Sequence, residues 1–300
     1  MGRRWTFSCV LLLIAVAAAN AAVPDRTVPV ADAFNAGILH VERFGNGRTR
    51  PVIFIPALFC GSWQWNGQVA ALAPAHEIYV VTLPGFDGRP AATGDDLMRR
   101  AADALHELVL SRKLERPVIV GHSLGAMLAV YFAERYPADE SGVVAVDGGY
   151  PYGKTQAERN AAVEEFVKPY LNVSRAEFGP VLRKNELQYD IISKQDVDKV
   201  EMLAARSDPK AVVAWARAGL ALDLTPGLHH IAGRFVEFIP YDRTIDRPQN
   251  VDSKRKKFGR WAAHARDGRV VMFAPSRHFI MFDQPDAFDS ALKAAVAVDP

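Results

Sequence analysis

The sequence predicts an α/β fold: a mostly parallel twisted sheet flanked by helices, with an inserted helical cap. Short, apolar, β-branched runs alternate with helical patterns in the first half of the chain and again near its end. Such runs are typical of strands that are buried on both faces. Between the two regions, residues 150 to about 228 have only helical patterns. An insertion of roughly 75–80 residues is too long for a plain crossover between strands.

The first predicted strand, residues 38–44, alternates in polarity and ends at Gly45-Asn46-Gly47, as an antiparallel edge strand does. The expected buried strands are residues 52–55, 78–81, 118–120, 143–146, 235–239 and 270–273. The helical patterns outside the cap cover residues 97–110, 126–135, 251–265 and the segment from residue 285 onwards. Strands separated by helices imply parallel units with right-handed crossovers.

The composition excludes several classes of protein. With 49% hydrophobic and 23% charged residues in a chain of 300, intrinsic disorder is excluded. The formal net charge of +2 provides no field that would steer the chain to nucleic acid. The cysteines are Cys9 and Cys60, too few for a disulfide framework. Because the chain shows no metal-ligand spacing, we expect no metal and no cofactor, and a small molecule as its partner.

The N-terminus has the pattern of a secretory signal peptide. Two arginines precede the uncharged run from Trp5 to Ala19, and Ala19-Asn20-Ala21 follows with small residues at the two positions that a signal peptidase reads. We therefore expect residues 1–21 to be removed and residues 22–300 to form a single domain with a cap at about 150–228. The alternative is a membrane anchor, for which the uncharged stretch is long enough only at the margin. Cleavage would leave a periplasmic or secreted protein without stable membrane insertion.

Ser123 is the candidate nucleophile. It lies at the centre of Gly121-His122-Ser123-Leu124-Gly125, between a predicted strand and a predicted helix. A serine on such a sharp turn projects from the carboxyl end of the strand, where open α/β sheets bind their ligands. The two glycines remove side chains that would clash where the helix crosses the strand.

Because of this serine motif and its position between a strand and a helix, the chain from about Ile38 to its C-terminus resembles the α/β-hydrolase superfamily. Three further segments carry the resemblance, in the family's order: residues 55–65, 83–88 and 276–285. The first resembles the loop after the family's third strand, although Pro56-Ala57 stands where His-Gly is usual. The resemblance implies the α/β-hydrolase fold and a serine hydrolase with a helical lid.

A serine hydroxyl needs a base to take its proton, and His278 is a better candidate for this base than His122. It follows the last predicted strand and so lies at the same edge of the sheet as Ser123. His122 adjoins the serine, but neighbours on a tight turn point apart, so we interpret it as a packing or hydrogen-bonding residue. Cys60 is interpreted as structural, because it has no evident base partner.

The acid that orients the base remains open among three residues. Asp242 and Asp246 both follow the predicted strand at 235–239, and Asp242 is favoured because it is nearer to the strand and better fixed. Asp147, which follows the strand at 143–146, is a third possibility that some family members use. For the oxyanion hole, the resemblance points to the backbone amides of Leu58 and Leu124.

The leading functional hypothesis is a secreted serine hydrolase that cleaves an ester or related acyl bond of a small, fairly apolar substrate. Aromatic and sulfur residues of the cap could line an apolar pocket, although such residues more often form the lid's own core. The alternatives are other chemistries on the same fold: hydrolysis of a carbon–carbon bond, a lactone or an amide, or cofactor-free lyase or peroxidase activity. A non-catalytic binding protein of the same fold is the third hypothesis.

Overall fold

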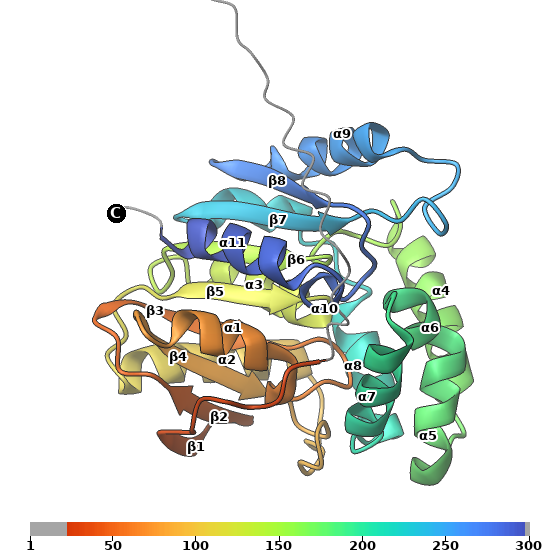
Figure 1. The fold of residues 1–300 in the computed structure, drawn as a ribbon, viewed down its shortest axis with the longest axis horizontal. Helices are drawn as coiled ribbons and strands as arrows, with labels where there is room; N and C mark the ends of the chain where they lie inside the picture. The colour runs from red at the N-terminus through yellow and green to blue at the C-terminus, as the bar shows by residue number, and fades with distance from the viewer. Residues whose placement is uncertain (1–22, 298–300) are drawn as a thin grey trace, which may run out of the picture.

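The computed structural model describes residues 23–297, and their sheet has eight strands in the order β1-β2-β4-β3-β5-β6-β7-β8 (Figure 1). The strands β1 and β2 pair antiparallel, as do β2 and β4, and all other pairs are parallel. The predicted α/β-hydrolase fold class is confirmed. The strands are β1 (Asp32–Ala36), β2 (Leu39–Phe44), β3 (Thr49–Ile55), β4 (His76–Thr82), β5 (Val118–His122), β6 (Gly142–Val146), β7 (Arg234–Pro240) and β8 (Gly268–Phe273).

Helices cover both faces of the sheet (Figure 1). One face carries α1 (Asn66–Leu72) and α11 (Pro285–Val296), and the other carries α2 (Leu97–Ser111), α3 (Leu124–Arg135) and α9 (Val251–Ala262). A short helix, α10 (Ile280–Asp283), precedes α11. The central strands β5 and β6 are buried along their whole length, as strands between two helical layers should be.

The sequence analysis did not predict the strand β1 or the helix α1. The strand β1 pairs only with β2 at the edge of the sheet, and its residues alternate between partly buried and exposed until Ala36. The helix α1 is short, and it directly follows the 3₁₀ turn η1 (Ser62–Trp65). Both are stabilised by tertiary packing rather than by a periodic apolar pattern of their own.

The segment between β6 and β7 forms the cap, which lies beyond the carboxyl ends of the strands (Figure 1). Its last long helix packs against α2 and α3, so the cap is joined to the sheet domain by side-chain contacts. Its elements are α4 (Gln156–Val167), η2 (Lys168–Tyr170), α5 (Arg175–Leu182), the π-helical turn η3 (Arg183–Leu187), α6 (Gln188–Asp190), α7 (Lys194–Ala204), α8 (Pro209–Gly219) and η4 (Thr225–His230).

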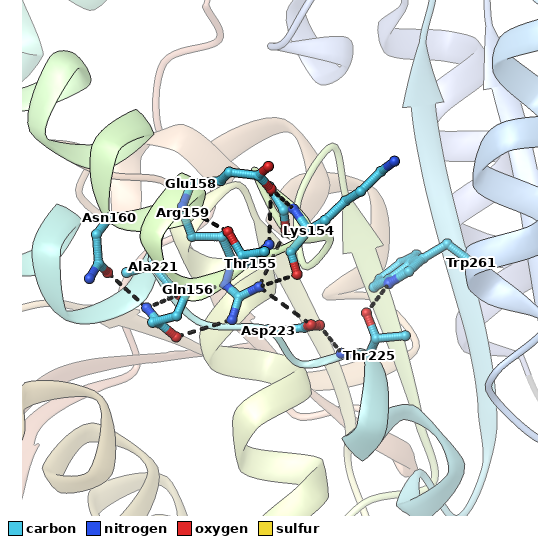
Figure 2. Close-up of polar contacts among 11 residues, drawn as sticks. Lys154, Thr155, Gln156, Glu158, Arg159, Asn160, Ala221, Asp223, Thr225 and Trp261 are labelled. Carbon is cyan, nitrogen blue, oxygen red and sulfur yellow. Dashed lines mark hydrogen bonds and ion pairs between the residues drawn. The ribbon is translucent and has the colours of Figure 1, made fainter.

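Arg159 joins the two ends of the cap at its base (Figure 2). Its guanidinium donates to the carbonyl of Ala221 on the exit side (3.0 Å) and to the carbonyls of Gly153 (3.3 Å) and Lys154 (3.2 Å) on the entry side. Asp223 lies 3.6 Å away, and the arginine side chain is only 9% exposed. A single buried cation therefore satisfies backbone carbonyls from both connections, which fixes where the cap leaves and rejoins the sheet domain.

The first described residues contact both the cap and the sheet domain and so connect the two. Val23 is buried, and its amide donates to Asp196 of α7, while Lys199 of the same helix donates to the Val23 carbonyl. On the other side, the Asn66 side chain donates to the carbonyl of Pro24 (3.1 Å). The predicted signal peptide, residues 1–21, lies outside the described residues. Among residues 23–297, no helix is both long enough and apolar enough to cross a bilayer.

Candidate active site

Ser123 lies on a strained turn between β5 and α3. Its backbone has φ 54° and ψ −116°, a conformation that residues with a Cβ rarely adopt. The turn is held by a hydrogen bond from the Ser123 amide to the Val146 carbonyl, at 2.9 Å. A Cβ on Gly121 would lie 2.1 Å from the Gly125 carbonyl oxygen, and one on Gly125 would lie 2.3 Å from the Ile55 carbonyl oxygen. Both positions therefore require glycine.

His278 contacts Asp147. The Nδ1 atom of His278 lies 2.6 Å from Oδ2 of Asp147, in a partly buried pair. Asp147 directly follows β6, has a positive φ of 41°, and donates its amide to the Phe238 carbonyl at 2.9 Å. A second oxygen of the carboxylate accepts from the Tyr150 hydroxyl at 3.3 Å. Asp147 is thus fixed on both its backbone and its side chain, with the imidazole as its closest partner.

The expected contact between Asp242 and His278 is not formed, and this expectation is corrected. The Asp242 carboxylate instead accepts from Arg277 Nε at 2.7 Å. Asp246 does not reach His278 either, because it pairs with Lys254 at 2.7 Å. The loop after β7 therefore directs both carboxylates to local cations.

The packing of the loops and their local ion pairs account for the difference. The strand β6 lies beside β5 in the sheet, whereas β7 is one strand further away. A residue directly after β6 therefore lies beside the Ser123 turn, although the strand next to β8, which precedes His278, is β7. The sequence carried one signal of this, since Asp147 is followed directly by Gly148-Gly149. A Cβ on Gly148 would lie 2.5 Å from the Ser123 carbonyl oxygen, so the Asp147 loop packs directly on the serine turn.

The candidate donors of the oxyanion hole are the backbone amides of Leu58 and Leu124. Leu124 opens α3 directly after the serine, and Leu58 lies in the loop after β3. Within residues 23–297, neither amide donates a hydrogen bond to protein. The Pro56-Ala57 pair does not disturb this loop, because the positive φ falls two residues later, at Phe59 (56°). Two free N–H groups beside a nucleophile are what an oxyanion hole requires.

Cys60, in the same loop, is a buried free thiol. Burial raises its pKa well above the usual value, with smaller contributions from Asp87 and Asp190. The thiol therefore stays protonated and is a poor nucleophile.

A cavity of about 520 Å³ brings the candidate residues together. Ser123, His278 and Leu58 line it from the sheet domain, and cap residues close it from above. Six large cap residues could line a pocket or form the lid's own core: Phe166, Tyr170, Phe178, Tyr189, Met202 and Trp215. Of these, Phe166 lines the cavity. The side chains of Tyr170, Phe178 and Trp215 are buried in the protein core, whereas Tyr189 and Met202 are exposed. The volume is that of a site for a small molecule.

Besides the exposed Glu165, the cap contributes two partly buried carboxyl groups that the sequence analysis did not single out. Glu186, in the π-helical turn η3, and Asp190, in α6, both line the cavity. Burial raises the pKa of Asp190 to about 6 and that of Glu186 to about 7, to which the charge of Asp190 adds. Because helical residues at this spacing share one face, both groups face the cavity from the same side.

These carboxylates act on His278. Burial alone would lower its pKa, but the hydrogen bond and charge of Asp147, followed by the charges of Asp190 and Glu186, raise it to about 9. The imidazolium is therefore favoured at neutral pH in the free protein. A base must be neutral to accept a proton, so alkaline pH should favour any reaction that uses His278 as a base.

Comparison with known proteins agrees with the fold. The sequence profile of the alpha/beta hydrolase family matches residues 52–291, most of the chain. Among curated proteins, RutD of Escherichia coli O1:K1, whose name refers to carbamate hydrolysis, is 29% identical over 98 residues. That match covers 32% of this chain and only 37% of the relative's length.

Solved structures are similar over almost the whole chain at low identity. A hydrolase from Pseudomonas aeruginosa PA01 has a TM-score of 0.75 at 16% identity, and the match covers 90% of this chain and 100% of that one. An esterase from Thermogutta terrifontis has a TM-score of 0.71 at 18% identity, covering 88% and 97%. The enol-lactonase from Burkholderia xenovorans LB400 has a TM-score of 0.69 at 17% identity, covering 87% and 96%. At such identities the likeness shows the fold alone.

We expect Asp147→Asn to lower kcat for a p-nitrophenyl ester by about 10⁴-fold, because the imidazole loses the carboxylate that orients it and stabilises its charge. Asp242→Asn and Asp246→Asn should each cost less than about tenfold. Steady-state kinetics on one substrate compares the three, and melting temperatures check that each variant is folded. A large loss at Asp242 with little loss at Asp147 would reverse the assignment.

In the pH profile, kcat/KM should rise through an apparent pKa near 9, the value that the surrounding carboxylates give His278. Asp190→Asn removes one of the charges that favour the imidazolium, so this limb should move to lower pH. The matched control is Glu165→Gln, since Glu165 also lines the cavity but its side chain is 77% exposed and screened by solvent. Equal profiles for wild type and Asp190→Asn would contradict the coupling.

Proposed function

The chain belongs to the α/β-hydrolase family, and we propose that it is a serine hydrolase that cleaves an ester or related acyl bond of a small, fairly apolar substrate. One observation carries this proposal. Ser123, on its strained turn, and His278, on its carboxylate partner Asp147, line the same cavity. A nucleophile, a base and an orienting acid are the three groups that covalent acyl transfer needs.

In the proposed reaction, the neutral His278 takes the proton of the Ser123 hydroxyl as its oxygen attacks the substrate carbonyl. The Leu58 and Leu124 amides donate to the oxyanion that forms. His278 then gives the proton to the leaving alcohol, and an acyl-enzyme remains at Ser123. Water, deprotonated by His278, attacks the acyl group. The tetrahedral intermediate then collapses and releases the acid, while His278 returns its proton to the Ser123 oxygen. Throughout the cycle, Asp147 holds Nδ1 of the imidazole and stabilises its positive charge.

The cavity supports a substrate with an apolar acyl or alcohol group. Beside the reacting residues, most of its lining is apolar, and Glu186 and Asp190 are the partly buried carboxyls among it. The lining residues without a polar side-chain atom are Ala57, Leu58, Phe59, Ala162, Val163, Phe166 and Leu220. Because structural relatives of this fold include an esterase and an enol-lactonase, a panel of p-nitrophenyl esters, lactones, amides and carbamates should define the bond that is cleaved.

Ser123→Ala should abolish turnover and labelling by a fluorophosphonate probe, because the change removes the only oxygen that forms the acyl-enzyme. The fold should be preserved, since the hydroxyl makes no hydrogen bond to the other described residues. Activity is measured on the best substrate of the panel, and circular dichroism checks the fold. Wild-type turnover in this variant would place the nucleophile elsewhere. Absence of labelling in the wild type would favour a binding protein.

We also propose that the chain is exported, because residues 1–21 have the charge, length and cleavage-site pattern of a signal peptide. Removing them takes away Arg3 and Arg4 from a total of 36 basic residues, so that 34 basic and 34 acidic residues remain. Expression of the full chain in a Gram-negative host should give a soluble periplasmic protein that begins at Ala22. Intact-mass measurement tests this. A species that keeps Met1 in the membrane pellet would support an anchor instead.

A further inference from the structure

A buried chain of hydrogen bonds connects two loops of the candidate active site. The amide of Ala57, in the loop after β3, donates to Oε1 of Gln64 at 2.9 Å. The Nε2 atom of Gln64 lies 3.0 Å from Nδ1 of His122. The Nε2 atom of His122 lies 3.0 Å from the carbonyl oxygen of His278. Both bridging side chains, Gln64 and His122, are completely buried.

The position of every proton in this series of hydrogen bonds follows from the first bond, the one from Ala57 to Gln64. A backbone N–H can only donate, so the Gln64 oxygen faces Ala57 and the Gln64 amide nitrogen faces His122. That nitrogen can only donate, so Nδ1 of His122 is an acceptor and carries no proton. The proton of a neutral imidazole is then on Nε2, where it donates to the carbonyl of His278. Each of the three contacts thus has one donor and one acceptor.

The surroundings of His122 keep it neutral. Burial lowers its pKa well below the usual value, and the neighbouring charge of His278 lowers it further. A protonated His122 would also turn Nδ1 into a donor facing the donor on Gln64. His122 is therefore neutral whichever protonation state His278 adopts during turnover, and it remains a fixed brace.

The two ends of the chain are two working parts of the site. Ala57 directly precedes Leu58, which lines the cavity together with Ser123 and whose amide is a donor of the proposed oxyanion hole. His278 is the proposed base, and it is held at its ring by Asp147 and at its backbone by His122. Pro56 gives the oxyanion loop no side-chain donor of its own, so the brace comes from Gln64 in η1.

We propose that Gln64 and His122 are positioning residues which fix the oxyanion-hole loop relative to the base, a role that rests on the proposed serine hydrolase function. Neither Gln64 nor His122 is among the residues that line the cavity. Both act through the backbone, Gln64 on the Ala57 amide and His122 on the His278 carbonyl. Their loss should therefore weaken stabilisation of the transition state more than binding of the substrate.

The experiment compares Gln64→Met and His122→Phe, which keep a similar volume but remove the polar atoms. We expect kcat to fall by about 10–100-fold, the effect of misplacing reacting groups by a fraction of an ångström to one ångström. KM should change by less than about threefold. Affinity for a boronic acid that forms a tetrahedral adduct with the serine should fall in parallel with kcat, because the adduct uses the same oxyanion hole.

Three further variants separate positioning from a general loss of stability. Gln68→Met removes another buried glutamine, whose side chain donates to the Asp289 carboxylate over 2.8 Å and does not line the cavity. This variant should leave kcat unchanged. His122→Gln keeps one acceptor and one donor, and it should recover at least part of the kcat that His122→Phe loses. The double variant Gln64→Met/His122→Phe should lose no more kcat than the worse single variant, because either substitution alone already breaks the hydrogen-bonded connection between the two loops.

All kcat values are divided by the number of sites that a fluorophosphonate titrates, so that unfolded protein does not count as lost catalysis. Variants with lower melting temperatures but a wild-type kcat per titrated site would overturn the proposal. Losses that multiply in the double variant would do so as well, since the two residues would then act separately. If the wild type itself fails to label, the proposed function fails, and this outcome is distinct from failure of the positioning role.

Discussion

The sharp backbone turn at Ser123, with its positive φ, is the constraint on which the rest of the site depends. Because the turn is sharp, β5 passes directly into α3, and the first turn of that helix lies against the loop that follows β3. Glycines at 121, 125 and 148 allow the backbones to approach so closely that any Cβ would lie within 2.5 Å of a carbonyl oxygen. The strain of one residue is thus supported by three segments of chain, and these segments also carry the other parts of the site.

The cap has an electrostatic role besides closing the cavity. Two of its carboxyl groups, Glu186 and Asp190, act on His278 across the cavity, and each is itself partly protonated near neutral pH. Cap and base are therefore coupled: a change that moves η3 or α6 away from the cavity would also lower the basicity of the imidazole. The π-helical form of η3 is consistent with this role, since such turns often occur at functional sites.

Most of the fold and two of the three proposed catalytic groups could be predicted from the sequence, because their signals are local. Ser123 is marked by its glycines between a strand and a helix, and His278 by its place after the last strand. The carboxylate partner could not be chosen in this way. Asp147, Asp242 and Asp246 all follow strands, and only their partners in the folded protein separate them: His278 for Asp147, Arg277 for Asp242 and Lys254 for Asp246.

The same limit applies to the remaining groups. Glu186 and Asp190 resemble any acidic residues on the surface of a helix until the cap is folded over the cavity. The bond from Gln64 to His122 joins residues that are 58 positions apart, and no sequence pattern predicts it. Long-range pairing of polar side chains is decided by tertiary packing, whereas strand and helix patterns are decided within a few residues.

The contacts of Val23 make the first described residue part of the joint between the cap and the sheet domain. Asp196 is completely buried, and its Oδ1 atom receives the Val23 amide, while Oδ2 has no hydrogen-bond partner among residues 23–297. A recombinant protein that starts at Pro24 would lack this amide and leave a buried carboxylate without it, a costly arrangement. The first residue of a recombinant protein therefore affects how firmly α7 is held. A protein trimmed past Val23 and one with an N-terminal tag before Val23 should differ in this contact.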